Sequence, residues 1–518
     1  MKPLCFVLDS AVRERTPKAM LKGEWHCERA RDSRRFQRIY LDSLDWRLLR
    51  SDLCLVADRL GGGFHLRLVA LRSNRTVLET NASQLPVFVP SPLAEEFNKV
   101  LAPILRRRAL VPQIQLEVTR HSMAVLDGQG DTVAYLDLEL SEPIPEDGAE
   151  PCRLPRRLWF APVESYEKQN RAIVNILSDY GLPVSGEVFP VTQLVVAMNI
   201  DTSRFDARPN LTFHAEDRCD VAAKRLLGFF LSVMETNRPA IVADIDADCL
   251  HDFRVALRRS RSLLGQLREV MAKRRLEHAR AFFSRLSETT NHQRDLDVML
   301  SNFDFYRSLL PARTRSHLDA VYACIVDQRR AALGVTTHFL NSADYRRFVR
   351  SWRKYLEAEP PRRAAPKNAA KPVKAMADAR IWKAYRRVLT EGGAIDDESP
   401  PEALHSLRKR CKTLRYLIEF FASLYTAGKI QQVLKALKRL QDNLGEYQDL
   451  HVHGVLLGNA RKVLAEQDLL ASESDTAITR VTQALARRGV ERRDQFRKCF
   501  MAFGAEGNQR MFKRLFRS

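Results

Sequence analysis

Two stretches of the chain share a pattern of His and basic residues that could hold an anion. In LHDFRVALRRSRSLL (250–264) one His and three Arg recur at spacings of three, four and three residues, and LHSLRKRCKTLRYLI (404–418) repeats the spacing. On a helix these spacings place four side chains on one face over about 15 Å of axis. The candidate ligands are His251, Arg254, Arg258 and Arg261 in the first stretch, and His405, Arg408, Lys412 and Arg415 in the second.

These two faces carry no acid between 254 and 261 or between 408 and 415. For one helix alone, a basic face that is merely solvated would be the simpler interpretation. Exposed helix faces usually mix charge signs, however, and unpaired like charges repel, so two such faces favour an anionic ligand. We expect the two His to donate to phosphate oxygens or to orient a neighbouring Arg, because neither has a carboxylate to prepare it as a phosphate acceptor.

The similarity between the two stretches extends along the chain. A shift of 154 residues, without a gap, also pairs Arg285 with Arg439 and Asp295 with Asp449. It predicts a duplicated helical unit that packs as a pseudo-symmetric pair. We expect Asp295 and Asp449 to brace the basic helices by pairing with Arg rather than to bind a metal, because the His residues around them do not superpose between the copies.

The net charge is the unusual bulk property of this chain. Its 84 Lys and Arg exceed its 63 Asp and Glu and give a formal charge of +21, which favours polyanionic partners such as nucleic acid, anionic membrane or polyphosphate. The nine Cys are scattered and never spaced as C-x-x-C, so neither disulfides nor a zinc site is expected. No stretch has the roughly 18 apolar residues of a membrane span, and a cytoplasmic location is predicted.

Periodicity divides the chain into two domains. Residues 1–185 contain short alternating strands such as FHLRLVAL (64–71), with a hairpin turn at 61–63 and helices near 91–108 and 163–180. After a connector at 186–212 the period becomes 3.6, which predicts an all-helical domain at 213–515. Its expected parts are repeat one (213–358), a flexible Pro, Ala and Lys-rich linker (359–375) and repeat two (376–515). The fold class is therefore α+β.

The repeated motifs, together with LKRLQDNLGEYQDL (437–450), resemble the CHAD domain, the conserved-histidine α-helical domain. The resemblance implies a pseudo-twofold helical bundle whose basic cavity binds inorganic polyphosphate without catalysis, in some members at polyphosphate granules. Thr413 stands where the first copy has Arg259, and Ser284 and Ala281 stand opposite Lys438 and Lys435. The full predicted polyphosphate-binding set is His251, Arg254, Arg258, Arg259, Arg261, Arg285, His405, Arg408, Lys412, Arg415, Lys435, Lys438 and Arg439.

The first domain is similar to the CYTH, or triphosphate tunnel, family in YLDSLDWRLLRSDLCL (40–55), LEVTRHS (116–122) and ESYEKQNRAIVNIL (164–177). That family opens with E-x-E-x-K, where this chain has PLCFVLD. Two-metal chemistry needs clustered acids to hold its cations. We therefore expect a degenerate tunnel with no metal or cofactor, retained as a scaffold or as a weaker anion site.

These observations favour non-catalytic binding of inorganic polyphosphate, with attachment to granules as the resemblance implies. One alternative is a metal-dependent triphosphatase or phosphohydrolase in the first domain, which the missing E-x-E-x-K disfavours. The other is general nucleic-acid binding, which the charge permits. The basic helices lack the interleaved aromatic residues that stack on bases, so we expect nucleic acid to bind only non-specifically.

Overall fold

The fold is taken from a computed structural model of the chain, which divides into two compact units, residues 1–205 and 206–518. The structure describes residues 4–8, 17–21, 23, 25–30, 33–73, 75–89, 95–144, 154–180, 182, 184, 190–202, 209, 211–359 and 366–517.

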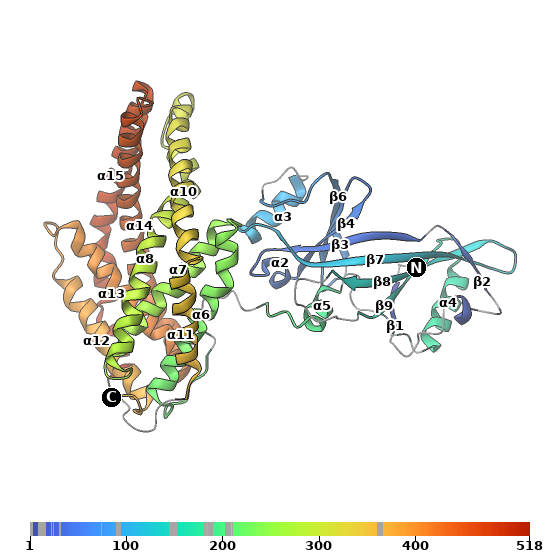
Figure 1. The fold of residues 1–518 in the computed structure, drawn as a ribbon, viewed down its shortest axis with the longest axis horizontal. Coiled ribbons are helices and arrows are strands. Elements are labelled where there is room, and N and C mark those ends of the chain that lie inside the picture. Colours follow the sequence, from blue (N-terminus) through green and yellow to red (C-terminus); the bar gives the residue numbers. More distant parts are fainter. Residues whose placement is uncertain are drawn as a thin grey trace. The chain divides into compact units, whose positions relative to one another are not determined.

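The first unit is built on a nine-stranded antiparallel sheet that curves into a half-barrel (Figure 1). The strands are β1 (Leu4–Leu8), β2 (His26–Arg29), β3 (Arg34–Asp42), β4 (Leu53–Leu60), β5 (Gly63–Ala70), β6 (Arg75–Ala82), β7 (Val111–Leu126), β8 (Thr132–Pro143) and β9 (Arg156–Pro162). Their order is β1-β9-β8-β7-β3-β4-β5-β6, and β2 pairs with β7. This half-barrel is consistent with the predicted tunnel-like domain.

Alternation along the strands sends side chains to two opposite faces of the sheet. On β3, Ile39 and Leu41 pack with residues of helix α3, whereas Phe36 and Tyr40 pack with residues of helix α5. The helices of this unit are α1 (Pro17–Met20), α2 (Arg47–Arg50), α3 (Glu95–Leu105), α4 (Glu167–Asp179) and α5 (Val191–Ala197). The predicted turn at 61–63 joins β4 to β5, with Gly61 at a φ of +60° that suits glycine.

The predicted boundary at residue 185 lies too early in the chain. Helix α5 falls inside the predicted connector, yet its Val191 and Leu194 are buried with Tyr40 and Trp46 of the sheet domain. The contacts divide the chain after residue 205 instead, because the apolar face of α5 needs the sheet to cover it.

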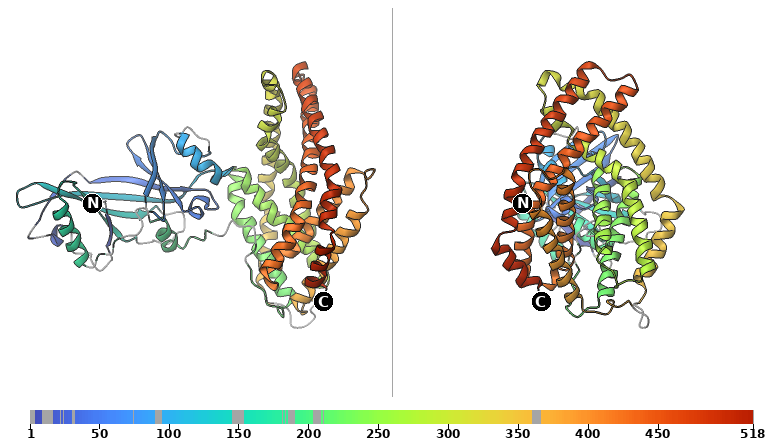
Figure 2. Two further views of the ribbon diagram at one scale, coloured as in Figure 1. Left: turned by 180° about the vertical axis from the view of Figure 1, so that it is seen from behind. Right: turned by 90° about the vertical axis from the view of Figure 1, so that its left-hand side faces the viewer.

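The second unit is entirely helical in its described residues (Figures 1 and 2). Its α-helices are α6 (Cys219–Val242), α7 (Ala247–Leu264), α8 (Lys273–Ser301), α9 (Phe303–Ser308), α10 (Asp319–Leu340), α11 (Ala343–Glu357), α12 (Val373–Gly393), α13 (Pro401–Phe420), α14 (Ala427–Glu466), α15 (Ser472–Phe503) and α16 (Glu506–Phe516). Two short 3-10 helices, Ala312–Leu318 and Ala422–Leu424, join them.

The helix boundaries reproduce the internal repeat. Helices α6, α7 and α8 begin at residues 219, 247 and 273, and α12, α13 and α14 begin at 373, 401 and 427, each 154 residues later. Further along, α10 and α15 reach the same end of the unit, and both contribute to one apolar cluster with residues of α8 and α14 (Figure 2). The duplication inferred from the basic motifs therefore includes whole helices.

The prediction of a flexible linker at 359–375 is wrong for its described second part. The amides of Cys219 and Asp220 donate to the carbonyls of Lys371 and Ala369, at 3.0 Å each, and α12 already begins at Val373. Ala369 and Val373 are fully buried. The composition of the stretch misleads because these backbone groups find partners at the start of α6, a contact that depends on tertiary structure.

Among the described residues no helix is long and apolar enough to cross a membrane. The eight Cys that the structure describes are free thiols, and Cys152 lies outside the described residues.

Candidate anion-binding site

The basic helices of the two copies, α7 and α13, touch each other. Arg258 Nε on α7 donates to Tyr416 Oη on α13 at 2.9 Å, and Arg259 pairs with Glu419 of α13 at 2.6 Å. Residues that lie 158 and 160 positions apart in the sequence are thus brought together near the pseudo-symmetry axis of the repeat.

Four cations gather where these helices meet, and we name Arg254, Arg258, Arg408 and Lys412 the central cluster. All four side chains are partly buried. Two of them are held in place by α8 or α14. Arg254 donates to the carbonyl of Ser287 at 3.1 Å and to Thr290 Oγ1 at 2.6 Å, and Arg408 pairs with Asp449 at 3.3 Å.

The electrostatics of the central cluster show that it is short of negative charge. Burial, reinforced by the charges of Arg258 and Arg408, lowers the pKa of Lys412 to about 7. Burial and the neighbouring Arg258 lower the pKa of Arg254 to about 10. Arg408 also has a buried Nε without a hydrogen-bond partner among the described residues. An anion in the cluster would relieve both the repulsion and the unmet donor.

The two His occupy equivalent places on α7 and α13, and both are partly buried. His405 Nδ1 lies 2.6 Å from Gln448 Oε1. Because an amide oxygen can only accept, Nδ1 must donate, and Nε2 becomes a donor only when the ring is protonated. Burial lowers the pKa of His405, and the nearby Lys and Arg oppose protonation as well. His405 therefore donates to phosphate through Nε2 only if the anion promotes its protonation.

Arg259 is a predicted ligand that the structure places outside the central cluster. Its side chain is turned away from solvent, with 5% of the residue exposed, and its guanidinium pairs with Glu419 and lies over the ring of Tyr416. Glu419 also forms an ion pair with Arg415 at 2.7 Å. Arg259 is a structural ion-pair partner between the two copies. The shift of 154 residues places Gly265 at the position equivalent to Glu419, so the first copy has no such acid for a cation at position 413.

The remaining predicted ligands lie outside the central cluster. Arg285 is exposed and pairs with Asp344 of α11 at 2.9 Å, so it belongs to another face of α8. Arg261 and Arg415 are exposed at the ends of their rows, where Arg261 donates to Ser287 Oγ at 2.8 Å. The later basic residues of the second copy are exposed on α14: Lys435, Lys438 and Arg439.

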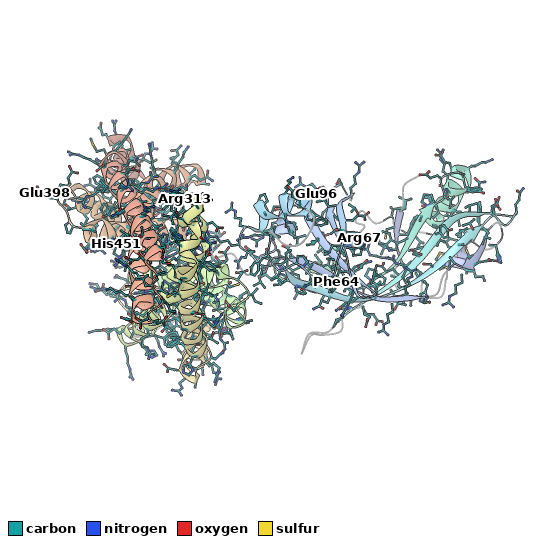
Figure 3. All side chains as sticks on the ribbon, turned by 90° about the horizontal axis from the view of Figure 1, so that it is seen from above. Phe64, Arg67, Glu96, Arg313, Glu398 and His451 are labelled. Atoms are coloured by element: carbon teal, nitrogen blue, oxygen red, sulfur yellow. The ribbon has the colours of Figure 1, made fainter. Side chains whose placement is uncertain are left out.

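The two predicted bracing acids differ in their contacts. Asp449 pairs with Arg408, and its charge also supports the protonated forms of Lys412 and His453. Asp295 has no ion pair within 4.0 Å in the described part of the chain, although its charge favours the protonated form of Arg254. His451 is exposed on α14 (Figure 3). No group of three or more His, Cys, Asp or Glu among the described residues is arranged to hold a metal.

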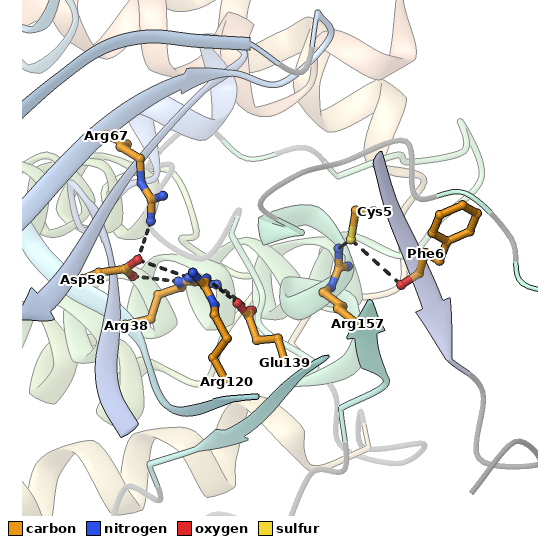
Figure 4. Close-up of polar contacts among 8 residues, drawn as sticks. All are labelled: Cys5, Phe6, Arg38, Asp58, Arg67, Arg120, Glu139 and Arg157. Atoms are coloured by element: carbon orange, nitrogen blue, oxygen red, sulfur yellow. Dashed lines mark hydrogen bonds and ion pairs between the residues drawn. The ribbon is translucent and has the colours of Figure 1, made fainter. Parts of the chain in front are cut away.

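The half-barrel contains a second set of charges that sequence reasoning missed (Figures 3 and 4). Arg38 is 1% exposed and donates to Asp58 at 2.7 and 3.1 Å and to Glu139 at 2.7 Å. Arg67 also pairs with Asp58, and Arg120 pairs with Glu139 at 2.8 Å. Burial raises the pKa of Asp58 and Glu139, but the charges and hydrogen bonds of Arg38 and the neighbouring Arg together outweigh it and hold both pKa values below the ordinary ones.

This network does not fit a divalent metal, because both buried carboxylates are already bound by guanidinium groups. Helix α5 covers the neighbouring surface, where Gln193 accepts from Arg157 at 2.9 Å. The cavity beside them measures about 30 Å³ and has room for about one or two water molecules. A signal was present in the sequence: Arg38 on β3 and Asp58 on β4 fall on the same alternation as the buried apolar residues Tyr40 and Val56.

The helical unit matches a known domain family. The family model of the CHAD domain matches residues 225–458. A crystal structure of the CHAD domain from the plant Ricinus communis is 22% identical, with a TM-score of 0.48, covering 57% of this chain and 96% of that one. PptA from Streptomyces chartreusis is 14% identical, with a TM-score of 0.41, covering 55% of this chain and all of that one. No curated protein matches the chain. Residues 225–458 therefore form a CHAD domain.

Proposed function

We propose that the CHAD domain of this protein binds inorganic polyphosphate in the central cluster and does not transform it. The observation that carries the proposal is the gathering of four cations from both copies of the repeat, with one ion pair to an acid among them. Such a site attracts a ligand that brings several closely spaced negative charges. A phosphate polymer meets this requirement along its whole length.

The groups around the central cluster have positioning roles in this proposal. Tyr416 holds Arg258, and Thr290 and the carbonyl of Ser287 hold Arg254, so that these guanidinium groups are oriented before the polymer arrives. Pre-oriented Arg forks donate paired hydrogen bonds to phosphate oxygens, which are stronger than bonds between neutral groups. Lys412 adds a single charge close to them.

The half-barrel serves as a scaffold without catalysis in this proposal. Support comes from Asp58 and Glu139, whose carboxylates are bound by Arg38, and from α5, which leaves little space beside Arg157. A metal-dependent triphosphatase would need free acids to hold its cations. Release of phosphate from tripolyphosphate by purified protein with Mg²⁺ or Mn²⁺ would contradict the scaffold role.

The direct test is binding of long-chain polyphosphate at near-physiological salt to the wild type and to a quadruple variant, R254Q/R258Q/R408Q/K412Q. Removing four contacts should abolish tight binding and reduce the slope of log K against log salt by about 3, at roughly 0.7 per contact of a flexible polyanion. A matched control removes the same charge from exposed residues of α12 and α15: Lys383, Arg386, Arg480 and Arg487, each changed to Gln.

Duplex DNA as competitor separates specific binding from general basicity. We expect DNA not to displace polyphosphate from the wild type, and the control variant to keep its affinity. Equal losses in the quadruple and control variants, or displacement by DNA at matched phosphate concentration, would reduce the site to a basic surface.

The cellular part of the proposal is that the protein is cytoplasmic and attaches to polyphosphate granules. It rests on the family resemblance and on the same central cluster. A fluorescent fusion should mark granules in polyphosphate-rich cells, and the quadruple variant should be diffuse. A granule signal that survives in the quadruple variant would show that another feature targets the protein.

A further inference from the structure

Helices α6 and α11 enclose a basic groove on the CHAD domain, apart from the central cluster. Two adjoining hollows of about 400 and 610 Å³ share Glu235, Arg353 and Glu357 in their walls. No residue of the central cluster lines either hollow. We name this feature the α6–α11 groove. Its cationic lining is Arg238, Arg346, Arg350, Arg353 and Lys354.

The sequence of α11 explains why its cations gather at the groove. Large residues at 345, 348, 352 and 356 are buried and anchor the helix. The cations at 346, 350, 353 and 354 follow the same helical period and are all exposed. They form a row over about 12 Å of helix axis, comparable in length to the basic row on α7.

These cations have little negative charge to balance them. The side chains of Arg350, Arg353 and Lys354 make no ion pair or hydrogen bond with any other described residue. The groove has two acids, and one of them, Glu235, accepts a hydrogen bond from Tyr345 Oη at 2.7 Å. Arg238 is fixed by the carbonyl of Leu340 at 3.1 Å. A row of unpaired like charges beside a concave surface is better explained by an anionic ligand than by solvation alone.

The duplication repeats the basic row of α11 in part. The shift of 154 residues moves α11 onto 497–511, where α15 ends at Phe503 and α16 begins at Glu506. Helix α16 nevertheless takes the place of α11 in the second copy, because it packs against α12 as α11 packs against α6. It carries exposed cations at 510, 513 and 514 beside the buried residues 512 and 516, a spacing like that of α11. The first cation of this second row, Arg510, pairs with Glu506 at 3.0 Å, whereas its equivalent on α11, Arg350, has no ion pair with a described residue.

We propose that the α6–α11 groove is a second binding site for a linear phosphate polymer, which holds a segment of chain outside the central cluster. This inference rests on the proposed function for its choice of ligand. A nucleic acid suits the groove less well, because Tyr345, the aromatic residue in its wall, is buried and cannot stack on bases. Long chains should then bind more tightly than short ones, because one polymer can occupy both sites.

The test compares R350Q/R353Q/K354Q with the quadruple variant of the central cluster. Calorimetry with short-chain polyphosphate should find two classes of site in the wild type, and only the central class, with unchanged Kd, in the groove variant. For long chains, the groove variant should lose about 2 from the slope of log K against log salt. Lys383, Arg386 and Arg480, changed together to Gln, provide an equal loss of exposed charge, and unchanged thermal unfolding confirms that each variant is folded.

The outcomes separate this inference from the proposed function. One class of short-chain site in the wild type, or a groove variant that matches the control triple, overturns the groove and leaves the central site standing. Loss of binding in the groove variant, with none in the quadruple variant, supports the groove and overturns the central site. Displacement of groove-bound polyphosphate by duplex DNA also overturns the inference, since it reveals general basicity.

Discussion

Lys412 should couple polyphosphate binding to proton uptake. Its pKa of about 7 in the free protein results first from burial and then from the charges of Arg258 and Arg408. A bound phosphate polymer opposes both effects and should return the pKa toward the ordinary value of 10.5. Protonated Lys412 thus favours the bound state, so affinity should fall as pH rises through 7.

The size of the effect follows from linkage. With a free pKa of about 7 and a bound pKa near 10.5, affinity should weaken about fivefold from pH 7 to pH 8 and about fiftyfold from pH 7 to pH 9. At pH 8 about 0.9 proton should be taken up by Lys412 for each binding event. Titrations in buffers of different ionisation enthalpy measure this number directly.

Lys412→Arg is the matched control, because it keeps the positive charge, while a guanidinium stays protonated throughout this range. The polymer's own titration is common to both proteins, so the difference between them isolates Lys412. We expect K412R to bind with little pH dependence and to lose the proton uptake. Identical proton uptake and pH dependence in K412R and wild type would refute the reasoning.

Three further predictions concern stability. The pKa of Lys412 is lower in the folded than in the unfolded state, so its charged form opposes folding below about pH 10 and most strongly below pH 7. K412M should therefore raise the urea midpoint of unfolding at pH 6 while it weakens polyphosphate binding. A lower midpoint would contradict this. Arg38→Met should destabilise the half-barrel by about 3–5 kcal/mol, because it leaves Asp58 and Glu139 buried without their shared cation. Unchanged rates of amide hydrogen exchange in β3 and β8 would count against this prediction. Asp42→Ala should lower the free energy of unfolding by about 1–3 kcal/mol, because the Asp42 carboxylate accepts from the amides of Ser43, Leu48 and Leu49 at 2.7–2.9 Å. Chemical denaturation followed by tryptophan fluorescence, which includes the buried Trp46 beside α2, measures this loss, and an unchanged midpoint would contradict the role of these hydrogen bonds.

The comparison of sequence and structure shows where local patterns suffice. The period of two within residues 1–185 and of 3.6 within residues 213–515 predicted the α+β class and both kinds of unit correctly, because periodicity reflects which side of each element meets the core. The shift of 154 residues predicted a duplicated helical unit, and three pairs of helices begin in that register in the structure. These features depend on near neighbours in the chain.

Local sequence patterns do not predict which spatial partner a residue contacts in the folded protein. Arg258 and Arg259 are adjacent in sequence and alike in type, yet a turn of about 100° along the helix sends the first to the central cluster and the second to Glu419. The buried network of the half-barrel needs Arg38 beside Glu139, 101 residues away. The order of the strands places these residues together, and no spacing in the sequence encodes it.

The sequence by itself determined two rows of basic residues on duplicated helices, because helical spacing fixes which side chains share a face. Only the tertiary structure decided that Arg254, Arg258, Arg408 and Lys412 share one partly buried cluster, while Arg285 and Lys438 pair with acids elsewhere. The physical reason is that burial and charge compensation depend on the packing of α7 against α13, α8 and α14. A group of cations becomes available to a ligand where that packing leaves more cations than carboxylates, as in the central cluster, where Arg408 alone pairs with a described acid.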